Sequence, residues 1–355
     1  MRKRTLSLIL TAIFAFSIMT GCSPKEQEVQ QPPVLQTEDT KSEENNNEVD
    51  NISEKEVMKI GMLNGPTAMG AVMLMNEVDN GTVFGNYEFQ IYTTPDEVMA
   101  KIISGELDVA AVPVNMAGVL YNKTNGQVLI AAVNTLGTLY LVENGTSVKS
   151  IEDVSGKSIV MAGQGAVPEY VLQYILDKAE VADCAIEFVQ SHAEAVAAVA
   201  GGKAELALLP EPFVSVATAK NNNLRVAIDI AQEWDMYSYE EDDVPNTLPM
   251  GCIVVRKEFL NKNQKEFNKF LDEYEYFVEV AIEDPAVTAD HVVNYGILEN
   301  RDIAEKAIPS CNIIYVEGSK MLRLVENFFT VMHEANPKSI GETMPEEDIY
   351  YVRRY

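Results

Sequence analysis

The chain has 355 residues, with 54 acidic and 27 basic side chains and a formal net charge of −27. This charge argues against binding to nucleic acid, because phosphates need a basic surface on the protein. It also argues against attachment to anionic lipid by charge alone. About 300 residues follow the amino-terminal segments, which is enough for two domains.

The first segment has the features of an export signal. Arg2, Lys3 and Arg4 precede an apolar run at residues 6–19, which is too short to span a membrane with margin. Met-Thr-Gly-Cys at 19–22 resembles a bacterial lipobox, which implies cleavage before Cys22 and acylation of its thiol. We therefore predict a lipoprotein signal peptide at residues 1–21. An ordinary secretory signal with a chance cysteine is the alternative.

The next segment, residues 22–57, is rich in Gln, Glu, Asn, Pro and Ser. Such a composition cannot bury enough apolar surface to offset the entropy cost of ordering the chain. We predict an acidic flexible tether that holds a folded domain outside the cytoplasm, anchored to the membrane through Cys22. No later segment is apolar over a length that would span a bilayer.

An internal repeat predicts the architecture. Thr94 and Glu97 form a capping-box pattern for a helix that ends at Gly105, and a short apolar strand then ends at Pro113. The same features return 97 residues later, at Ser191, Glu194, Gly202 and Pro210. Four features that share one offset are not expected by chance, so we infer two homologous units.

The rest of each unit follows the same order. Apolar strands at 60–63 and 159–161 each lead through a loop into a helix, at 68–78 and 168–176, and second strands follow at 87–92 and 186–190. Short apolar strands that alternate with helices predict parallel sheets covered on both faces. We therefore expect an α/β fold of two similar lobes, joined by a hinge, with a ligand cleft between them.

The chain is then expected to return to the first lobe. A strand at 250–256 and helical sequence at 259–283 follow after the second unit is complete. The predicted boundaries are 58–143 and 247–355 for lobe 1 and 144–246 for lobe 2. Two connections, near 140–145 and 246–250, are expected to form the hinge.

Three cysteines lie in the predicted domain: Cys184, Cys252 and Cys311. Their spacing matches no metal-binding pattern, so we expect neither a metal nor another cofactor. A disulfide between Cys252 and Cys311 is possible in an oxidising compartment, and buried free thiols are the alternative.

Several motifs carry a resemblance to a known family. They are the segments at 59–67 (Lys-Ile-Gly-Met-Leu-Asn-Gly-Pro-Thr), 105–110, 151–157, 209–212, 336–341 and 345–350. Together they resemble the nitrate/sulfonate/taurine and thiamine-pyrimidine group of solute-binding proteins of ABC importers, over residues 58–355. The resemblance implies a type II periplasmic-binding-protein fold, closure of two lobes on a small molecule, and delivery to a membrane permease. We expect a monomer.

Candidate ligand-binding residues lie at strand ends and helix starts, where ligands of parallel sheets bind. Free backbone N–H groups and glycines at such positions allow close approach to a ligand. In lobe 1 the candidates are Asn64, Gly65, Pro66, Thr67, Met69, Asn115, Asn134 and Thr135. In lobe 2 they are Gly163, Gln164, Gly165, Ala166 and Glu211.

Each candidate also has an ordinary structural explanation. The loops at 64–67 and 163–166 can be plain helix starts, and the amides of Asn115 and Asn134 can serve local turns. Glu211 lies between two prolines, where it can face the ligand or pair with a helix N-terminus or a hinge lysine. Trp234 and Tyr237 lie beside the second expected crossing, where an aromatic ring can stack on a ligand or pack the lobe.

The sequence favours a binding protein over an enzyme. The histidines are His192, His291 and His333, and none lies beside a serine or cysteine in a nucleophile motif. A pyrimidine-synthase-like enzyme of the same fold, and an adhesin or sensor that uses the same two-lobed trap, are the alternatives. Because the candidate loops lack basic side chains and include Glu211, we expect a neutral or cationic ligand. The family resemblance implies that a thiamine-precursor-like pyrimidine is one such ligand. The alternative ligands are sulfonates, taurine and nitrate.

Overall fold

The structure is a computed structural model that describes residues 56–238 and 248–353. The predicted signal peptide, Cys22 and nearly all of the predicted tether lie outside these residues. Within them, no helix is both long enough and apolar enough to cross a membrane. The described residues all fall in one compact unit.

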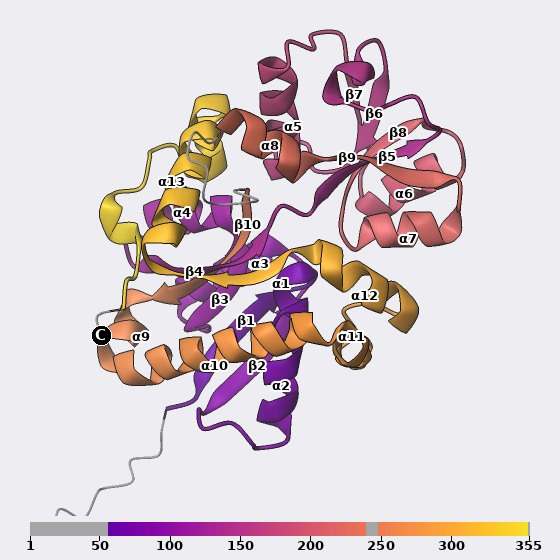
Figure 1. Cartoon of the computed structure of the whole chain (residues 1–355). Helices are drawn as coiled ribbons and strands as arrows, with labels where there is room; N and C mark the ends of the chain where they lie inside the picture. The colour runs from indigo at the N-terminus through magenta and orange to yellow at the C-terminus, as the bar shows by residue number, and fades with distance from the viewer. Residues whose placement is uncertain (1–55, 239–247, 354–355) are drawn as a thin grey trace, which may run out of the picture. The chain divides into compact units, whose positions relative to one another are not determined.

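The first sheet has six strands in the order β11-β4-β10-β3-β1-β2 (Figure 1). β1 pairs in parallel with β2 and β3, whereas β10 runs antiparallel to its neighbours β3 and β4. The strands are β1 (Met58–Leu63), β2 (Tyr87–Tyr92), β3 (Val109–Pro113), β4 (Val128–Leu136), β10 (Pro249–Arg256) and β11 (Ile313–Val316).

The second sheet has five strands in the order β7-β6-β8-β5-β9. β6 is parallel to β7 and β8, and β5 is antiparallel to β8 and β9. The strands are β5 (Leu139–Asn144), β6 (Ser158–Met161), β7 (Ala185–Phe188), β8 (Leu206–Pro210) and β9 (Leu224–Asp229). Two mixed α/β lobes, each around its own sheet, confirm the predicted fold class.

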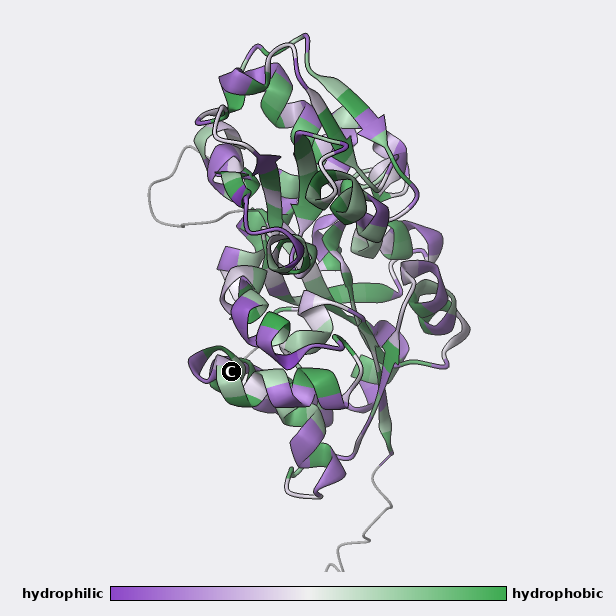
Figure 2. Cartoon of the chain, turned by 90° about the vertical axis from the view of Figure 1, so that its right-hand side faces the viewer, coloured by the Kyte–Doolittle hydropathy of each residue, from purple (hydrophilic) through white to green (hydrophobic). Residues whose placement is uncertain are grey.

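Helices cover both faces of each sheet, as the apolar strands require. In β8, Leu206 and Leu208 pack into one core cluster and Ala207 and Leu209 into another, because alternate side chains point to opposite faces. Figure 2 shows the hydrophobic residues concentrated in the strands and on one side of many helices. Lobe 2 carries α5 (Val167–Lys178), α6 (His192–Ala200), α7 (Phe213–Lys220) and α8 (Ile230–Ser238).

The helices of lobe 1 come from both ends of the chain. The amino-terminal set is α1 (Pro66–Met69), α2 (Val72–Asp79), α3 (Pro95–Ser104) and α4 (Val114–Lys123). The carboxyl-terminal set is α9 (Lys257–Lys262), α10 (Gln264–Glu283), α11 (Pro285–Asn294), α12 (Arg301–Ala307) and α13 (Gly318–Ala335), with the short 3₁₀ helices η2 (Ile308–Cys311) and η3 (Pro337–Ile340). The predicted helices at 68–78 and 259–283 are therefore each broken into two.

The two predicted capping boxes differ in the structure. The side chain of Ser191 accepts a hydrogen bond from the Glu194 N–H at 3.3 Å, as expected for an N-cap. Thr94 occupies the N-cap position of α3, but its side chain makes no cap bond. Gly105 ends α3 with φ of 81°, the left-handed conformation that glycine adopts most easily.

The first crossing between the lobes lies earlier than predicted. β4 ends at Leu136, and β5 begins at Leu139 and already pairs with β8 and β9 of the second sheet. Residues 139–143 therefore belong to the sheet of lobe 2, and the connection is Gly137–Thr138 rather than 140–145. The error arose because 128–142 reads as one apolar stretch, in which the only glycine is Gly137.

The return to the first sheet is confirmed by β10, which pairs with β3 and β4. Of the expected second crossing at 246–250, residues 246–247 lie outside the described residues, and Pro249 and Met250 already belong to β10. Of the two alternatives for the cysteines, a disulfide and free thiols, the structure has free thiols at Cys184, Cys252 and Cys311. Cys252 and Cys311 are buried. The Cys311 Sγ lies 3.7 Å from the sulfur of Met69.

The carboxyl-terminal segment is fixed by a buried arginine. The Arg353 side chain is 4% exposed and makes two bonds of 2.7 and 2.8 Å to the Glu317 carboxylate. It also forms an ion pair with Asp272 and lies 3.8 Å from Glu275. Burial of the Arg353 guanidinium costs free energy, and pairing with these carboxylates, which themselves reach solvent, offsets that cost.

We predict that Arg353→Ala lowers the free energy of unfolding by about 1.5–3 kcal/mol, because it removes the charge-assisted hydrogen bonds and the packing of a buried side chain. Urea denaturation of both variants measures the effect. The matched control is Arg301→Ala, since Arg301 also contacts three carboxylates but its side chain is 41% exposed. The control should cost less than about 1 kcal/mol. Equal losses in the two variants would contradict the assigned role of burial.

Candidate functional site

The carboxyl ends of the parallel strands in both lobes lie at the boundary between the lobes. β4 ends at this edge of the first sheet and leads through Gly137–Thr138 into β5. Leu139, the first residue of β5, pairs with Pro210, the last residue of β8. The edge of each sheet that normally binds ligands therefore lies next to the connection between the lobes.

Three predicted residues of lobe 1 come together around a glycine that the sequence did not single out. A Cβ on Gly251 would lie 2.7 Å from the Asn134 Oδ1, 2.7 Å from the Thr67 Cγ2 and 3.2 Å from the Thr135 Cβ. Thr67, Asn134 and Thr135 are all buried. The amide of Asn134 donates to the hydroxyl of Tyr274 at 3.0 Å, which fixes its orientation.

The loop after β1 supplies the most open of the lobe 1 candidates. Asn64 is exposed, and its N–H donates to the Tyr92 carbonyl at 2.8 Å. Gly65 has φ of 122°, which only glycine adopts readily, and it turns the chain into α1 together with the half-buried Pro66. Met69 is fully buried against Cys311 and therefore lies in the core.

The matching loop in lobe 2 also turns on glycines. Gly163 and Gly165 have φ of 92° and 72°, and Gln164 between them is exposed. After Ala166, α5 begins without a side-chain cap in the described residues. The Gly165 N–H donates to the Glu169 carboxylate at 2.5 Å, so a negative charge that the sequence analysis missed lies at this loop.

Asn115 and the two aromatic candidates serve structural contacts in this conformation. The Asn115 amide donates to the Ser339 carbonyl at 3.1 Å and so holds η3 against α4. Trp234 is fully buried, with its ring 5.2 Å from Tyr174 and 6.2 Å from Phe328 of lobe 1. Tyr237 is half-buried, and its carbonyl accepts a bond from the Tyr174 hydroxyl at 2.8 Å.

Glu211 is turned toward the start of its own helix. Its carboxylate accepts bonds from the Ser215 N–H at 3.1 Å and the Ser215 hydroxyl at 3.0 Å, and the residue is 4% exposed. Burial raises the pKa of the Glu211 carboxyl to about 7, against the opposing effects of Ser215 and Lys306. Of the two roles considered from the sequence, these contacts match pairing with a helix N-terminus.

Contacts between the lobes flank the boundary on more than one side. The Tyr140 hydroxyl of β5 donates to the Ser310 carbonyl of lobe 1 at 3.0 Å, and α7 packs on α12. On the other face, Asn336 donates to the Tyr170 hydroxyl at 2.6 Å, and α5 packs on α13. The two carboxyl edges are therefore held together in a closed arrangement.

His192 is a further residue near this edge. It is the first residue of α6, and its ring lies 5.1 Å from that of Phe213 at the start of α7. Its Nδ1 is buried without a hydrogen-bond partner among the described residues. Burial lowers the pKa of His192, so the ring is neutral at neutral pH.

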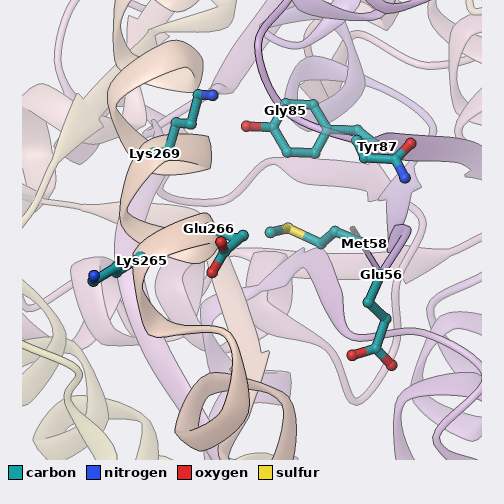
Figure 3. A pocket seen from close by; sticks show the side chains of 8 residues that line it. Glu56, Met58, Gly85, Tyr87, Lys265, Glu266 and Lys269 are labelled. Atoms are coloured by element: carbon teal, nitrogen blue, oxygen red, sulfur yellow. The ribbon is translucent and has the colours of Figure 1, made fainter. Parts of the chain in front are cut away.

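A pocket elsewhere in lobe 1 lies away from this boundary. It has a volume of about 130 Å³ and lies at the amino ends of β1 and β2, beside α10 (Figure 3). Met58 and Tyr87 form its apolar part, and Glu266, Lys265 and Lys269 come from the helix. In residues 56–238 and 248–353, no group of three His, Cys, Asp or Glu side chains could hold a metal ion.

Comparison with known proteins gives a family match and related folds. Residues 74–265 match the family model described as ABC transporter, phosphonate, periplasmic substrate-binding protein. A search of curated proteins finds no match.

Solved structures share the fold at low sequence identity. An ABC transporter protein from Parabacteroides distasonis is 22% identical, with a TM-score of 0.72 over 84% of this chain and 99% of that one. The periplasmic aliphatic sulphonate binding protein SsuA from Escherichia coli is 12% identical, with a TM-score of 0.62 over 84% and 95%. The desulfurization enzyme DSZB is 10% identical, with a TM-score of 0.55 over 79% and 93%.

We predict that Gly251→Ala destabilises the carboxyl edge of the first sheet. The added methyl group overlaps Asn134 and Thr67, and overpacking of this kind costs about 1–3 kcal/mol. Urea denaturation measures the loss. Thr67→Ser removes the clashing methyl group but keeps the hydroxyl that donates to the Leu63 carbonyl at 2.6 Å. The double variant should therefore recover part of the loss, and strictly additive losses would show that the assigned contact is wrong.

Proposed function

Because the chain belongs to the family of ABC-transporter phosphonate periplasmic substrate-binding proteins, we propose that it captures a small molecule with a phosphonate or sulfonate group between its two lobes. Proteins of this family act outside the cytoplasm and bind substrates for an ABC transporter. The fold also occurs in an enzyme. Our proposal is capture without chemical conversion, by a monomer that delivers the ligand to a permease.

One observation carries the choice of ligand class. α4 begins at the end of β3 and α5 begins after β6, so each lobe directs at least one helix start toward the boundary. Neither helix has a side-chain cap among the described residues, which leaves the first-turn N–H groups of α4 for a ligand. In α5, Pro168 has no N–H and the Glu169 N–H binds the Ala166 carbonyl at 3.1 Å. This helix therefore offers the N–H of Val167. An anion near a helix start gains about 0.3–1 kcal/mol, and backbone N–H bonds add to this.

The structure weakens the main argument for a cationic ligand. That argument assumed a charged Glu211 facing the ligand, where it would repel an anion. Its carboxylate instead binds Ser215, and burial raises its pKa to about 7, so a large fraction is uncharged at neutral pH. A phosphonate or sulfonate at the boundary therefore meets less repulsion than the sequence indicated.

The second candidate is a neutral or cationic heterocycle, such as a thiamine-precursor-like pyrimidine. The observation that favours it is the lack of Arg and Lys at positions 64–67, 113–115, 134–135 and 163–166. The carboxylate of Glu169, at the start of α5, also favours a cation. For either class we propose that Asn64, Gly65, Gly163 and Gln164 contact the ligand.

Glu169→Gln distinguishes the two classes. Calorimetry with methylphosphonate, ethanesulfonate and an aminopyrimidine should detect binding of at least one of the two anions. Loss of the negative charge at the start of α5 should then tighten anion binding about two- to fivefold. Asp177→Asn makes the same change of charge near the other end of α5 and should alter affinity less. Binding of the aminopyrimidine alone, weakened by Glu169→Gln, would favour the second candidate.

We also propose that Cys22 is acylated and anchors the protein to the membrane, because the sequence at 19–22 resembles a lipobox. Cys22→Ala should move the protein from the membrane fraction to the soluble fraction or leave its signal peptide uncleaved. Fractionation of cells and mass spectrometry of the amino-terminal peptide measure both effects. An unmodified Cys22 in the wild-type protein would rule out the anchor.

A further inference from the structure

Glu211 lies where groups from both lobes meet. Its N–H donates to the Thr138 carbonyl at 2.9 Å, which places it beside the connection between the lobes. Ser215 of α7 binds its carboxylate, and Tyr140 of β5 lies close enough to be affected by its charge. From lobe 1, α12 packs on α7, and the Ser310 carbonyl of η2 accepts from the Tyr140 hydroxyl at 3.0 Å, so both elements lie beside the helix and strand that flank Glu211. Cys311 of η2 and Lys306 of α12 are near enough to interact with its charge.

Within residues 56–238 and 248–353, no cation forms an ion pair with the Glu211 carboxylate. Burial raises the pKa of both Tyr140 and Cys311 above their usual values, so both are uncharged near neutral pH. Lys306 is exposed, and its effect on the pKa of Glu211 is smaller than that of burial and of the Ser215 hydrogen bonds. A charged Glu211 therefore has only the hydrogen bonds of Ser215 to offset the loss of solvent, and the neutral acid is favoured.

From this arrangement we infer that closure of the two lobes takes up one proton at Glu211, so that capture of a ligand is strongest at acidic pH. Closure brings η2 and α12 of lobe 1 over the carboxylate, and separation of the lobes returns it to water. The inference rests on the proposed function, in which the lobes open and close around a ligand.

The pH range follows from linkage between closure and proton binding. A glutamate carboxyl in water has a pKa of 4.5, whereas burial in the closed arrangement raises the pKa of Glu211 to about 7. The closed form therefore binds the proton more tightly than the open form. The stabilisation of the closed form by this proton is complete at pH values below the lower pKa. As pH rises between the two pKa values, the equilibrium constant for closure falls by up to about tenfold per pH unit. It changes little further above pH 7.

Glu211→Gln supplies the matched neutral side chain. Glutamine can accept from the Ser215 N–H through its oxygen and donate to the Ser215 hydroxyl through its amide. The variant should therefore stay closed at every pH. Ser215→Ala is a second variant, because it removes a donor that favours the charged form, so the loss of closure should extend to higher pH.

Hydrogen exchange followed by mass spectrometry tests the inference on the full chain in detergent, without any ligand. Wild type and Glu211→Gln are compared at equal pH, at pH 5.5 and pH 8, both above the isoelectric point near 4.4. The wild-type to variant ratio of exchange rates, in peptides covering 211–220 and 301–311, should rise about thirtyfold between the two values. Peptides covering 250–256 serve as the core control, and Glu88→Gln, which changes an exposed carboxylate, serves as the surface control.

A constant ratio in the boundary peptides would overturn the inference, as would an equal rise in the core peptides, which would indicate global unfolding. If Glu211→Gln fails to fold, the same peptides in Ser215→Ala should reach their limiting exchange at a higher pH than in wild type. An unchanged profile in that variant would also overturn it. The hydrogen-exchange experiment uses no ligand, so a negative result there concerns only proton uptake at Glu211. The proposed ligand class is tested separately by calorimetry.

Discussion

The antiparallel pairing of β5 with β8 is the constraint on which the rest of the structure depends. The connection Gly137–Thr138 is only two residues long, so β5 must begin at the edge of the first sheet where β4 ends. Its pairing with β8 then places Pro210 and Glu211 at the same boundary. The carboxyl edges of both sheets, with their loops and helix starts, meet there as a consequence.

The same constraint explains why polar groups are buried at the boundary. Asn134 is buried but bound to Tyr274, and Glu211 is buried but bound to Ser215, so each has a partner in its own lobe. Apolar contacts between the lobes, such as that of Trp234 with Phe328, stabilise the closed arrangement and lie away from the strand edges. A protein that opens and closes needs such groups to be stable in both forms, and partners within one lobe meet that requirement.

The sequence predicted the two-lobed fold and the return of β10, because the repeat and the apolar strands are local patterns. It misplaced the first crossing, since apolar residues continue from β4 into β5 and only the pairing of β5 shows where the sheet changes. Ser215 is four residues from Glu211 and could have been found from helix spacing. Lys306 and Cys311 could not, because only the folded chain brings them near Glu211. The choice of contact residues within the loops stays a prediction.

Capture between the lobes is the central claim, and the distance between the lobes tests it most directly. Cys184 on lobe 2 is partly exposed, and Glu88→Cys provides a second labelling position on the edge strand β2 of lobe 1. Pulsed electron spin resonance between labels at these positions should show a broad distance distribution without ligand. Saturation with the phosphonate or sulfonate that binds in calorimetry should narrow it to one short distance. A distribution that is the same with and without bound ligand would contradict the account.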